Sequence, residues 1–217
     1  MLIPQYPDRR LAAQPSAGTS QRAHTMPDPA AEHMPEQIVR GLGQLLAAHD
    51  PHTAAHAERV ASLAVRIARS LGLDAADVAI IRQAALLHDI GKLALSAALL
   101  ERRTPREQID EARVRRHPTL GARLLIALGI SAQVAELVRA HHERWDGAGY
   151  PDGLARADIP LGARVIAVAD VYDSLTHPRP GPAPLPTSAA ASVLLSDGGQ
   201  RLDPDLVMAL LDSLCLR

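Results

Sequence analysis

Two adjacent histidines stand directly before a glycine-rich turn. His141 and His142 lead into a stretch that contains Trp145, the only tryptophan of the chain, and Tyr150. Neighbouring residues on a helix point about 100° apart, so both imidazoles are hard to explain as core residues, whereas two metal ions can take one each. We interpret the pair as metal ligands.

A second chemically active motif lies upstream, where a histidine, a carboxylate and a lysine fall within five residues. It consists of His88, Asp89 and Lys92, and Lys92 is the only lysine although arginine is abundant. A compact ammonium group here can pair with a phosphate oxygen and stabilise developing charge. Taken alone, His88 is equally well explained as a histidine favoured by the dipole of a helix C-terminus.

The candidate metal ligands all offer imidazole or carboxylate donors and come from at least five predicted helices. They are His56, His88, Asp89, His117, His141, His142 and Asp170. Such donors suit first-row ions such as Fe, Mn, Zn, Ni or Co. Asp89 can bridge two ions roughly 3.5–4 Å apart, which would hold a hydroxide between them and polarise a phosphoryl oxygen. His56, His117 or Asp170 alone would more often be structural, but together the seven residues predict a metal-dependent hydrolase of phosphorylated substrates.

The residues of the glycine-rich turn each allow two interpretations. Trp145 and Tyr150 can pack the turn, or they can form a wall on which a nucleobase stacks. Glu143 and Asp146 can hydrogen-bond to metal ligands, or they can cap the turn. The sequence leaves both pairs of alternatives open.

The composition favours helices and argues against nucleic acid or a membrane as a partner. The 217 residues carry a net charge of −1, and only 2% are aromatic. Sequences rich in Ala and Leu favour helices over sheets, and a near-zero charge creates no field toward nucleic acid or anionic membranes. Cys215 alone forms no internal disulfide, and neither a membrane-spanning apolar run nor a signal peptide is recognisable. We expect a cytoplasmic protein without a DNA, RNA or membrane partner.

Apolar periodicity predicts an all-α protein. Residues 1–33 are rich in Pro, Ala, Ser, Gln and Arg and are expected to form a flexible tail ahead of one domain over 34–217. Asp74 is expected to cap a helix that ends at His88 and Asp89. The other predicted helices cover 35–48, 53–71, 106–116, 118–128, 131–143, 161–176, 187–197 and 204–215. Residues 93–105 are predicted as a short helix or loop, and 177–186 as a proline-rich loop.

Six segments together resemble the HD-GYP domain, a subgroup of the HD metal-dependent phosphohydrolases. They are 50–60, 84–92, 117–121, 141–151, 159–175 and 201–207, in the expected order. The resemblance implies an HD-type helical bundle around a di- or tri-metal centre, most often of iron, with manganese as the alternative. It also implies hydrolysis of the bacterial second messenger cyclic di-GMP to pGpG, and often on to GMP.

The resemblance also implies roles for individual residues. The family's metal ligands fall on the same seven positions that the donor chemistry selects. Lys92 matches a lysine that contacts phosphate, whereas Tyr150 and Arg179 match positions associated with substrate contact.

Three departures from the family pattern affect these expectations. His52 stands where members with a third metal carry a glutamate, so it either binds a third ion or caps its helix. Arg179-Pro180 is followed by Gly181-Pro182, where the family often has a tyrosine and a basic residue. Ser96-Ala97 replaces the usual Pro-Asp after the His-Asp motif.

Two other functions compete with an active cyclic di-GMP phosphodiesterase. One is a module that binds a cyclic dinucleotide or a signalling protein such as a diguanylate cyclase. The other is an HD phosphohydrolase for a different nucleotide. The helix over 35–48 either pairs with a second copy in a homodimer or packs on its own core.

Overall fold

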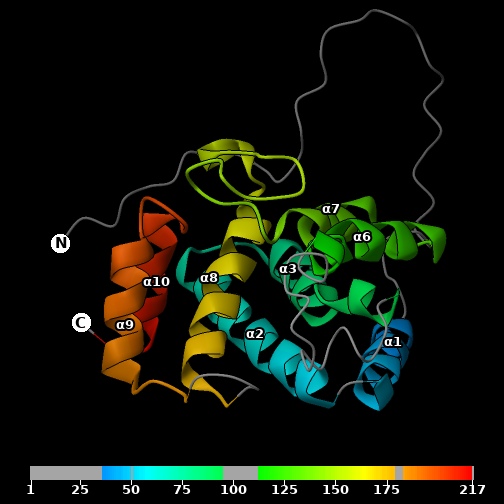
Figure 1. The fold of residues 1–217 in the computed structure, drawn as a ribbon, viewed down its shortest axis with the longest axis horizontal. Helices are drawn as coiled ribbons and strands as arrows, with labels where there is room; N and C mark the ends of the chain where they lie inside the picture. The colour runs from blue at the N-terminus through cyan, green and yellow to red at the C-terminus, as the bar shows by residue number, and fades with distance from the viewer. Residues whose placement is uncertain (1–35, 50, 95–111, 179–182, 217) are drawn as a thin grey trace, which may run out of the picture.

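The computed structural model describes residues 36–49, 51–94, 112–178 and 183–216, which form a bundle of helices (Figure 1). Within these ranges the only β-type pairing is an isolated bridge between Gly198 and Leu202, so the all-α prediction is confirmed. None of the described helices combines the length and apolar character needed to cross a membrane. The helices and the two short 3-10 helices (η) are α1 Glu36–His49, α2 Pro51–Ser70, α3 Ala75–Leu87, η2 Ile90–Ala94, α6 His117–Ala127, α7 Ala132–Ala140, η3 Arg156–Asp158, α8 Leu161–Thr176, α9 Thr187–Asp197 and α10 Pro204–Ser213.

Helices α2, α3 and α8 form the middle of the bundle. The pair α9 and α10 lies on one side of them, and α1, α6 and α7 lie on the other (Figure 1). Small side chains allow the central helices to approach closely, and Ala64, Ala84 and Ala169 are fully buried. Larger residues such as Ile81 and Ile166 fill the remaining space. This rigid centre carries most of the elements that supply candidate ligands.

Helix α1 packs on the core of its own chain. Its buried residues Val39 and Leu46 belong to the main hydrophobic cluster, and α1 contacts α2, α3 and η2. On the same helix Ile38 and Leu45 remain exposed. Packing on its own core, one of the two alternatives for this helix, is therefore observed.

Several of the predicted helix ends agree with the structure. Asp74 caps α3 by accepting a hydrogen bond from the Asp77 N–H at 2.9 Å, and Asp203 caps α10 by accepting one from Asp205 at 3.0 Å. Pro204 occupies the start of α10, where its missing N–H costs no helical hydrogen bond. Helices α8 and α9 cover the ranges predicted for them.

The prediction of a helix over 131–143 is wrong at its C-terminal end. Helix α7 ends at Ala140, and His141 is its C-cap. The Glu143 N–H bonds the Ala140 carbonyl in a tight turn, while the Glu143 side chain binds main-chain N–H groups of the following loop. The histidine pair therefore lies at the end of a helix and not within one.

Several predictions fall outside the described residues. These are the tail over 1–33, Ser96-Ala97, most of the helix over 106–116, Arg179-Pro180 and Gly181-Pro182. Of the segment 93–105, only the end of η2 is described.

Candidate metal centre

The seven predicted ligands converge in one cluster, in which all but the partly buried His142 and Asp170 are buried. Their donor atoms form three overlapping groups, and within each group the donors lie within 4.8 Å of one another. His88 joins two of the groups and His141 joins two, so the cluster is continuous. The groups are His117, His141 and His142; His88, Asp89 and His141; and His56, His88 and Asp170.

Three of the histidines are oriented by main-chain carbonyl groups three residues earlier in the chain. The Nδ1 atoms of His88, His117 and His141 lie 2.7, 2.7 and 2.6 Å from the carbonyl oxygens of residues 85, 114 and 138. His88 and His141 are the C-caps of α3 and α7, and the last carbonyls of a helix lack helical partners. Since a carbonyl only accepts, each Nδ1 carries the proton, and each Nε2 offers a lone pair to the cluster.

His56 is oriented differently because it lies inside α2, where the helix uses the main-chain carbonyls itself. Its Nδ1 lies 2.6 Å from Asp173 Oδ2, and its Nε2 lies 3.1 Å from Asp170 Oδ1. Arg59 donates from Nε to Asp173 Oδ1 at 2.6 Å and from Nη2 to Oδ2 at 3.1 Å. The Asp173 side chain has no exposed surface, and it also accepts from His177 at 2.9 Å.

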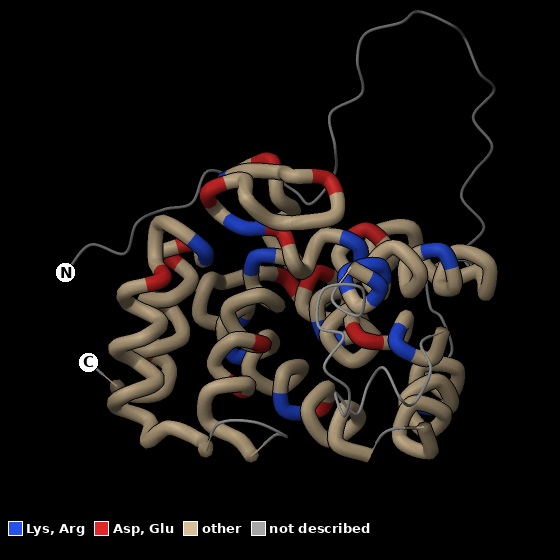
Figure 2. The backbone as a smooth tube through the Cα atoms, viewed as in Figure 1, with Lys and Arg blue, Asp and Glu red and all other residues tan. Residues whose placement is uncertain are grey.

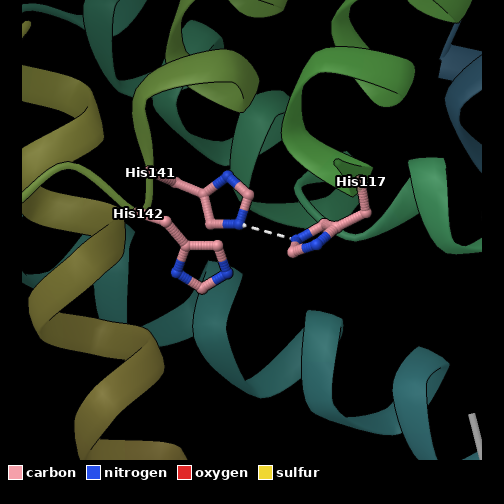
Figure 3. A group of neighbouring side chains, drawn as sticks. All are labelled: His117, His141 and His142. Atoms are coloured by element: carbon pink, nitrogen blue, oxygen red, sulfur yellow. Dashed lines mark hydrogen bonds between the residues drawn. The ribbon is translucent and has the colours of Figure 1, made fainter. Parts of the chain in front are cut away.

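The arrangement of the imidazoles fits bound cations. The Nε2 atoms of His117 and His141 face each other at 3.3 Å, with His142 beside them (Figure 3). Both Nδ1 atoms donate to carbonyls, so two lone pairs point at each other, and a positive ion between them would relieve the repulsion. Burial lowers the pKa of His141 well below its usual value and the pKa of His142 to about 3, which keeps both imidazoles neutral.

Asp89 has the geometry of a bridging carboxylate. Its Oδ1 lies 3.3 Å from His117 Nε2, and its Oδ2 lies 3.3 Å from His88 Nε2 and 2.6 Å from Lys92 Nζ. Burial opposes ionisation, but the charge of Lys92 and contacts with His88 and His117 hold the pKa of Asp89 well below its usual range. Asp89 therefore presents one ionised oxygen to each side of the cluster.

A contact between two glycines brings η2 against α6. A Cβ added to Gly91 would overlap the main-chain oxygen of His117 and the main-chain nitrogen of Gly121. Only glycine permits this approach, and the approach places His117 within reach of Asp89.

A cavity of about 290 Å³ opens from the cluster. Its lining includes His141, His142 and Asp170 at the metal-ligand end, together with Tyr150. The Tyr150 ring lies 5.0 Å from the His142 ring, and burial raises the Tyr150 pKa to about 12, so the phenol stays protonated. Lys92 does not line this cavity and is instead paired with Asp89.

Trp145 lies outside the cavity lining. Its main-chain N–H donates to the Arg201 carbonyl at 3.1 Å, its carbonyl accepts from Arg156 at 3.0 Å, and Arg164 lies 5.7 Å from its ring centroid. Of its two possible roles, this position favours packing of the turn over stacking with a nucleobase.

Glu143 and Asp146 both stabilise the turn itself. The Glu143 carboxylate accepts from the N–H groups of Asp152, Gly153 and Leu154 at 2.6, 3.1 and 3.1 Å. Asp146 accepts from the Ala148 N–H at 3.0 Å. These hydrogen bonds shape the loop that carries Tyr150, so the turn-capping alternative is observed for both residues.

The sequence interpretation missed the two residues that orient His56, namely Asp173 and Arg59. Asp173 follows Asp170 by three residues on α8, and Arg59 follows His56 by three on α2, so each pair lies on one helix face. That spacing was a usable signal. His177 is partly exposed and pairs with Asp173. His52 is exposed and belongs to none of the three donor groups found among the described residues.

Comparisons with known proteins agree with this geometry. A family model described as "HD domain" matches residues 40–206. The 3'3'-cGAMP-specific phosphodiesterase 3 of Vibrio cholerae is 36% identical over 214 residues, covering 96% of this chain and 46% of that protein. The cyclic di-GMP phosphodiesterase response regulator RpfG of Xanthomonas campestris is 38% identical, covering 83% of this chain and 48% of its own length. The chain thus spans about half the length of these relatives.

A solved structure supports the same assignment. Bd1817, an HDG"Y"P protein from Bdellovibrio bacteriovorus, aligns with a TM-score of 0.61 and 25% identity over 74% of this chain and 51% of its own. The chain therefore belongs to the HD domain family, whose members bind divalent metal ions. Within that family it is of the HD-GYP type, as the motif resemblance predicted.

Proposed function

We propose that the chain is a metal-dependent phosphodiesterase that hydrolyses cyclic di-GMP to pGpG, GMP or both. The observation that carries this proposal is the continuous cluster of seven donors, five of them buried, that opens into a cavity lined by Tyr150. Relatives named as cyclic dinucleotide phosphodiesterases support the substrate class.

The proposed centre holds two divalent ions, of iron or alternatively manganese. Its ligands are His56, His88, Asp89, His117, His141, His142 and Asp170. When bound, such ions act as Lewis acids toward a phosphoryl oxygen and make a water molecule acidic enough to attack at neutral pH. The neutral imidazoles and ionised carboxylates of this chain are the protonation states that metal binding requires. A third ion at His52 is not part of the proposal, since His52 is exposed and outside the donor groups.

The chain's own residues orient the phosphodiester. Asp89 fixes Lys92 through a 2.6 Å ion pair, and the remaining N–H donors of the ammonium can bind a phosphate oxygen. The protonated Tyr150 phenol offers a hydrogen-bond donor inside the cavity. Arg179 stays a predicted substrate contact that rests on the family resemblance alone.

A second candidate substrate is 3'3'-cGAMP, because the 36% identical V. cholerae relative is named as specific for it. Both molecules present a phosphodiester flanked by purine nucleosides, so the metal centre treats them alike. The choice between them depends on contacts in the cavity beyond the metal ligands.

We also propose that residues 34–217 form one HD-GYP domain that acts in the cytoplasm. Its proposed protein partner is either a second copy of the chain, in a homodimer, or a diguanylate cyclase.

The test is an anaerobic incubation of the purified protein, loaded with Fe(II) or Mn(II), with cyclic di-GMP and 3'3'-cGAMP side by side. Product separated by chromatography, absent with Asp89→Ala and retained with Asp152→Asn, would support the proposal. Asp152 is a matched control because its carboxylate is paired with Arg139 near the surface. No product at full metal loading would indicate a binding module or an HD phosphohydrolase for another nucleotide.

A further inference from the structure

The cavity beside the proposed metal centre is lined by groups of different chemistry. The lining includes the proposed ligands His141, His142 and Asp170, and it also includes Arg115 and Arg201. Arg115 precedes α6 and Arg201 lies in the turn between α9 and α10, so two distant parts of the chain bring positive charge to the same space. Basic positions are visible around the loop between α7 and α8 and the adjoining ends of α6 and α10 (Figure 2).

Arg115 is linked to the metal centre through one aromatic ring. Its guanidinium carbon lies 5.2 Å from the centroid of the Tyr150 ring, and that ring lies 5.0 Å from the His142 ring. A cation over an aromatic face is attracted by the ring quadrupole. This contact holds the Arg115 guanidinium at the cavity, with the Tyr150 ring between it and the proposed ligand His142.

Arg201 approaches the same phenol from the α9–α10 turn. Its positive charge, like that of Arg115, acts on the Tyr150 hydroxyl and counteracts part of the effect of burial on the Tyr150 pKa. The Arg201 Nη1 atom lies 3.8 Å from Asp197 Oδ2, too far for a hydrogen bond, and the Arg201 side chain is 47% exposed. Arg144 lines the same cavity but makes short paired hydrogen bonds to Asp146 at 3.0 and 2.6 Å, which neutralise its charge.

Arg115 and Arg201 thus place two guanidinium groups on the lining of the cavity that opens from the proposed metal centre. The planar guanidinium matches two oxygens of a phosphate at once. We infer that Arg115 and Arg201 form a second phosphate site, which holds the phosphate of a cyclic dinucleotide that is not being cleaved. This inference rests on the proposed function, because only a substrate with two phosphates would occupy the metal centre and the two arginines at once.

The test compares a substrate that has two phosphates with one that has a single phosphodiester. Arg115→Gln, Arg201→Gln and the double variant, all loaded with Mn(II), are assayed with cyclic di-GMP and with bis(p-nitrophenyl) phosphate. For cyclic di-GMP we expect the double variant to raise KM about tenfold with little change in kcat, a loss of about 1.4 kcal/mol of binding free energy. The kcat/KM for bis(p-nitrophenyl) phosphate stays unchanged.

Two further variants serve as controls. Arg66→Gln removes the same charge from the outer face of α2, away from the cavity, and should leave both substrates unaffected. Arg201→Lys keeps the positive charge but not the planar guanidinium. Its KM for cyclic di-GMP should lie between those of the wild type and Arg201→Gln. Metal content and melting temperature show that each variant is folded and loaded.

The outcomes separate the second phosphate site from the proposed function. Equal losses on both substrates, or an unchanged KM for cyclic di-GMP in the double variant, would overturn the site while the wild type remains a phosphodiesterase. A wild-type protein that cleaves bis(p-nitrophenyl) phosphate but neither binds nor cleaves cyclic dinucleotides would overturn both.

Discussion

The imidazole rings of histidines at helix ends and of the histidine inside a helix are oriented by different groups. His88 and His141 stand at the C-terminal ends of α3 and α7, where unpaired carbonyl groups orient their rings. His56 lies within α2, where no carbonyl is available, and depends on the buried carboxylate of Asp173. A histidine at a helix end is thus oriented by the backbone, whereas the histidine within a helix is oriented by a second side chain.

This difference extends to the charge of the rings. Burial lowers the His56 pKa, but hydrogen bonds to Asp170 and Asp173 outweigh it and raise that pKa above the usual value. At His141 burial lowers the pKa, and the neighbouring imidazoles add to the effect. The two kinds of ligand should therefore respond differently to mutation and to pH.

The largest effect is expected where both kinds of ligand depend on one residue. Asp89 contacts His88 and His117 through different oxygens and lies close enough to His56 to act on its charge. Asp89→Ala should reduce turnover by about a thousandfold or more and deplete bound metal. Metal analysis with turnover measurement checks this, and wild-type values for both would refute the assignment of the centre.

The difference between a histidine oriented by the backbone and one oriented by a side chain is tested most directly at Asp173. Asp173→Asn weakens the hydrogen bond to the mid-helix ligand and removes the charge that faces Arg59. We expect a loss of about 10- to 100-fold in metal affinity or activity, with metal lost first from the His56 side. Titration of metal into the stripped variant, beside Asp152→Asn, measures this. Equal affinity in the two variants would show that the carboxylate does not orient the ligand.

A smaller effect is expected from the matching change at a helix end. Val138→Ala removes a fully buried side chain but leaves the carbonyl that orients His141. The free energy of unfolding should fall by about 1–3 kcal/mol, while metal content and kcat stay near wild type. Denaturant unfolding and metal analysis together check the result. Loss of metal would mean that side-chain packing, and not the carbonyl, holds the ring.

The smallest perturbation is a change of pH in the metal-free protein. Because the His56 pKa is raised and the His142 pKa is lowered to about 3, His56 should take up its proton first as the pH falls. His142 should stay neutral until the solution is strongly acidic. NMR of the imidazole nitrogens follows both residues, and the reverse order would contradict the electrostatic difference.

Residue types and helical spacing were enough to predict the ligand cluster and most of the helices. The donors were recognisable because imidazole and carboxylate groups suit the same metal ions and because two adjacent histidines are hard to explain as core residues. The end of α7 was missed, because the Glu143 carboxylate binds N–H groups nine to eleven residues further along, beyond any local pattern. The partnership of His56 with Asp173 spans 117 residues and depends on how α2 packs against α8. The spacing of residues three apart within each helix was a usable signal for the faces involved, but the pairing of the two faces depends on this packing.

The contact at Gly91 has a consequence for transferring this centre to another protein. The gap between the segment of His88 and Asp89 and the segment of His117 is set by a hydrogen atom where every other amino acid has a carbon. A designer who copied only the seven donors onto a new helical scaffold would reproduce the chemistry but not the spacing. The transferable unit is the set of proposed ligands together with the glycine contact, because Gly91 sets the distance between the two segments that carry them.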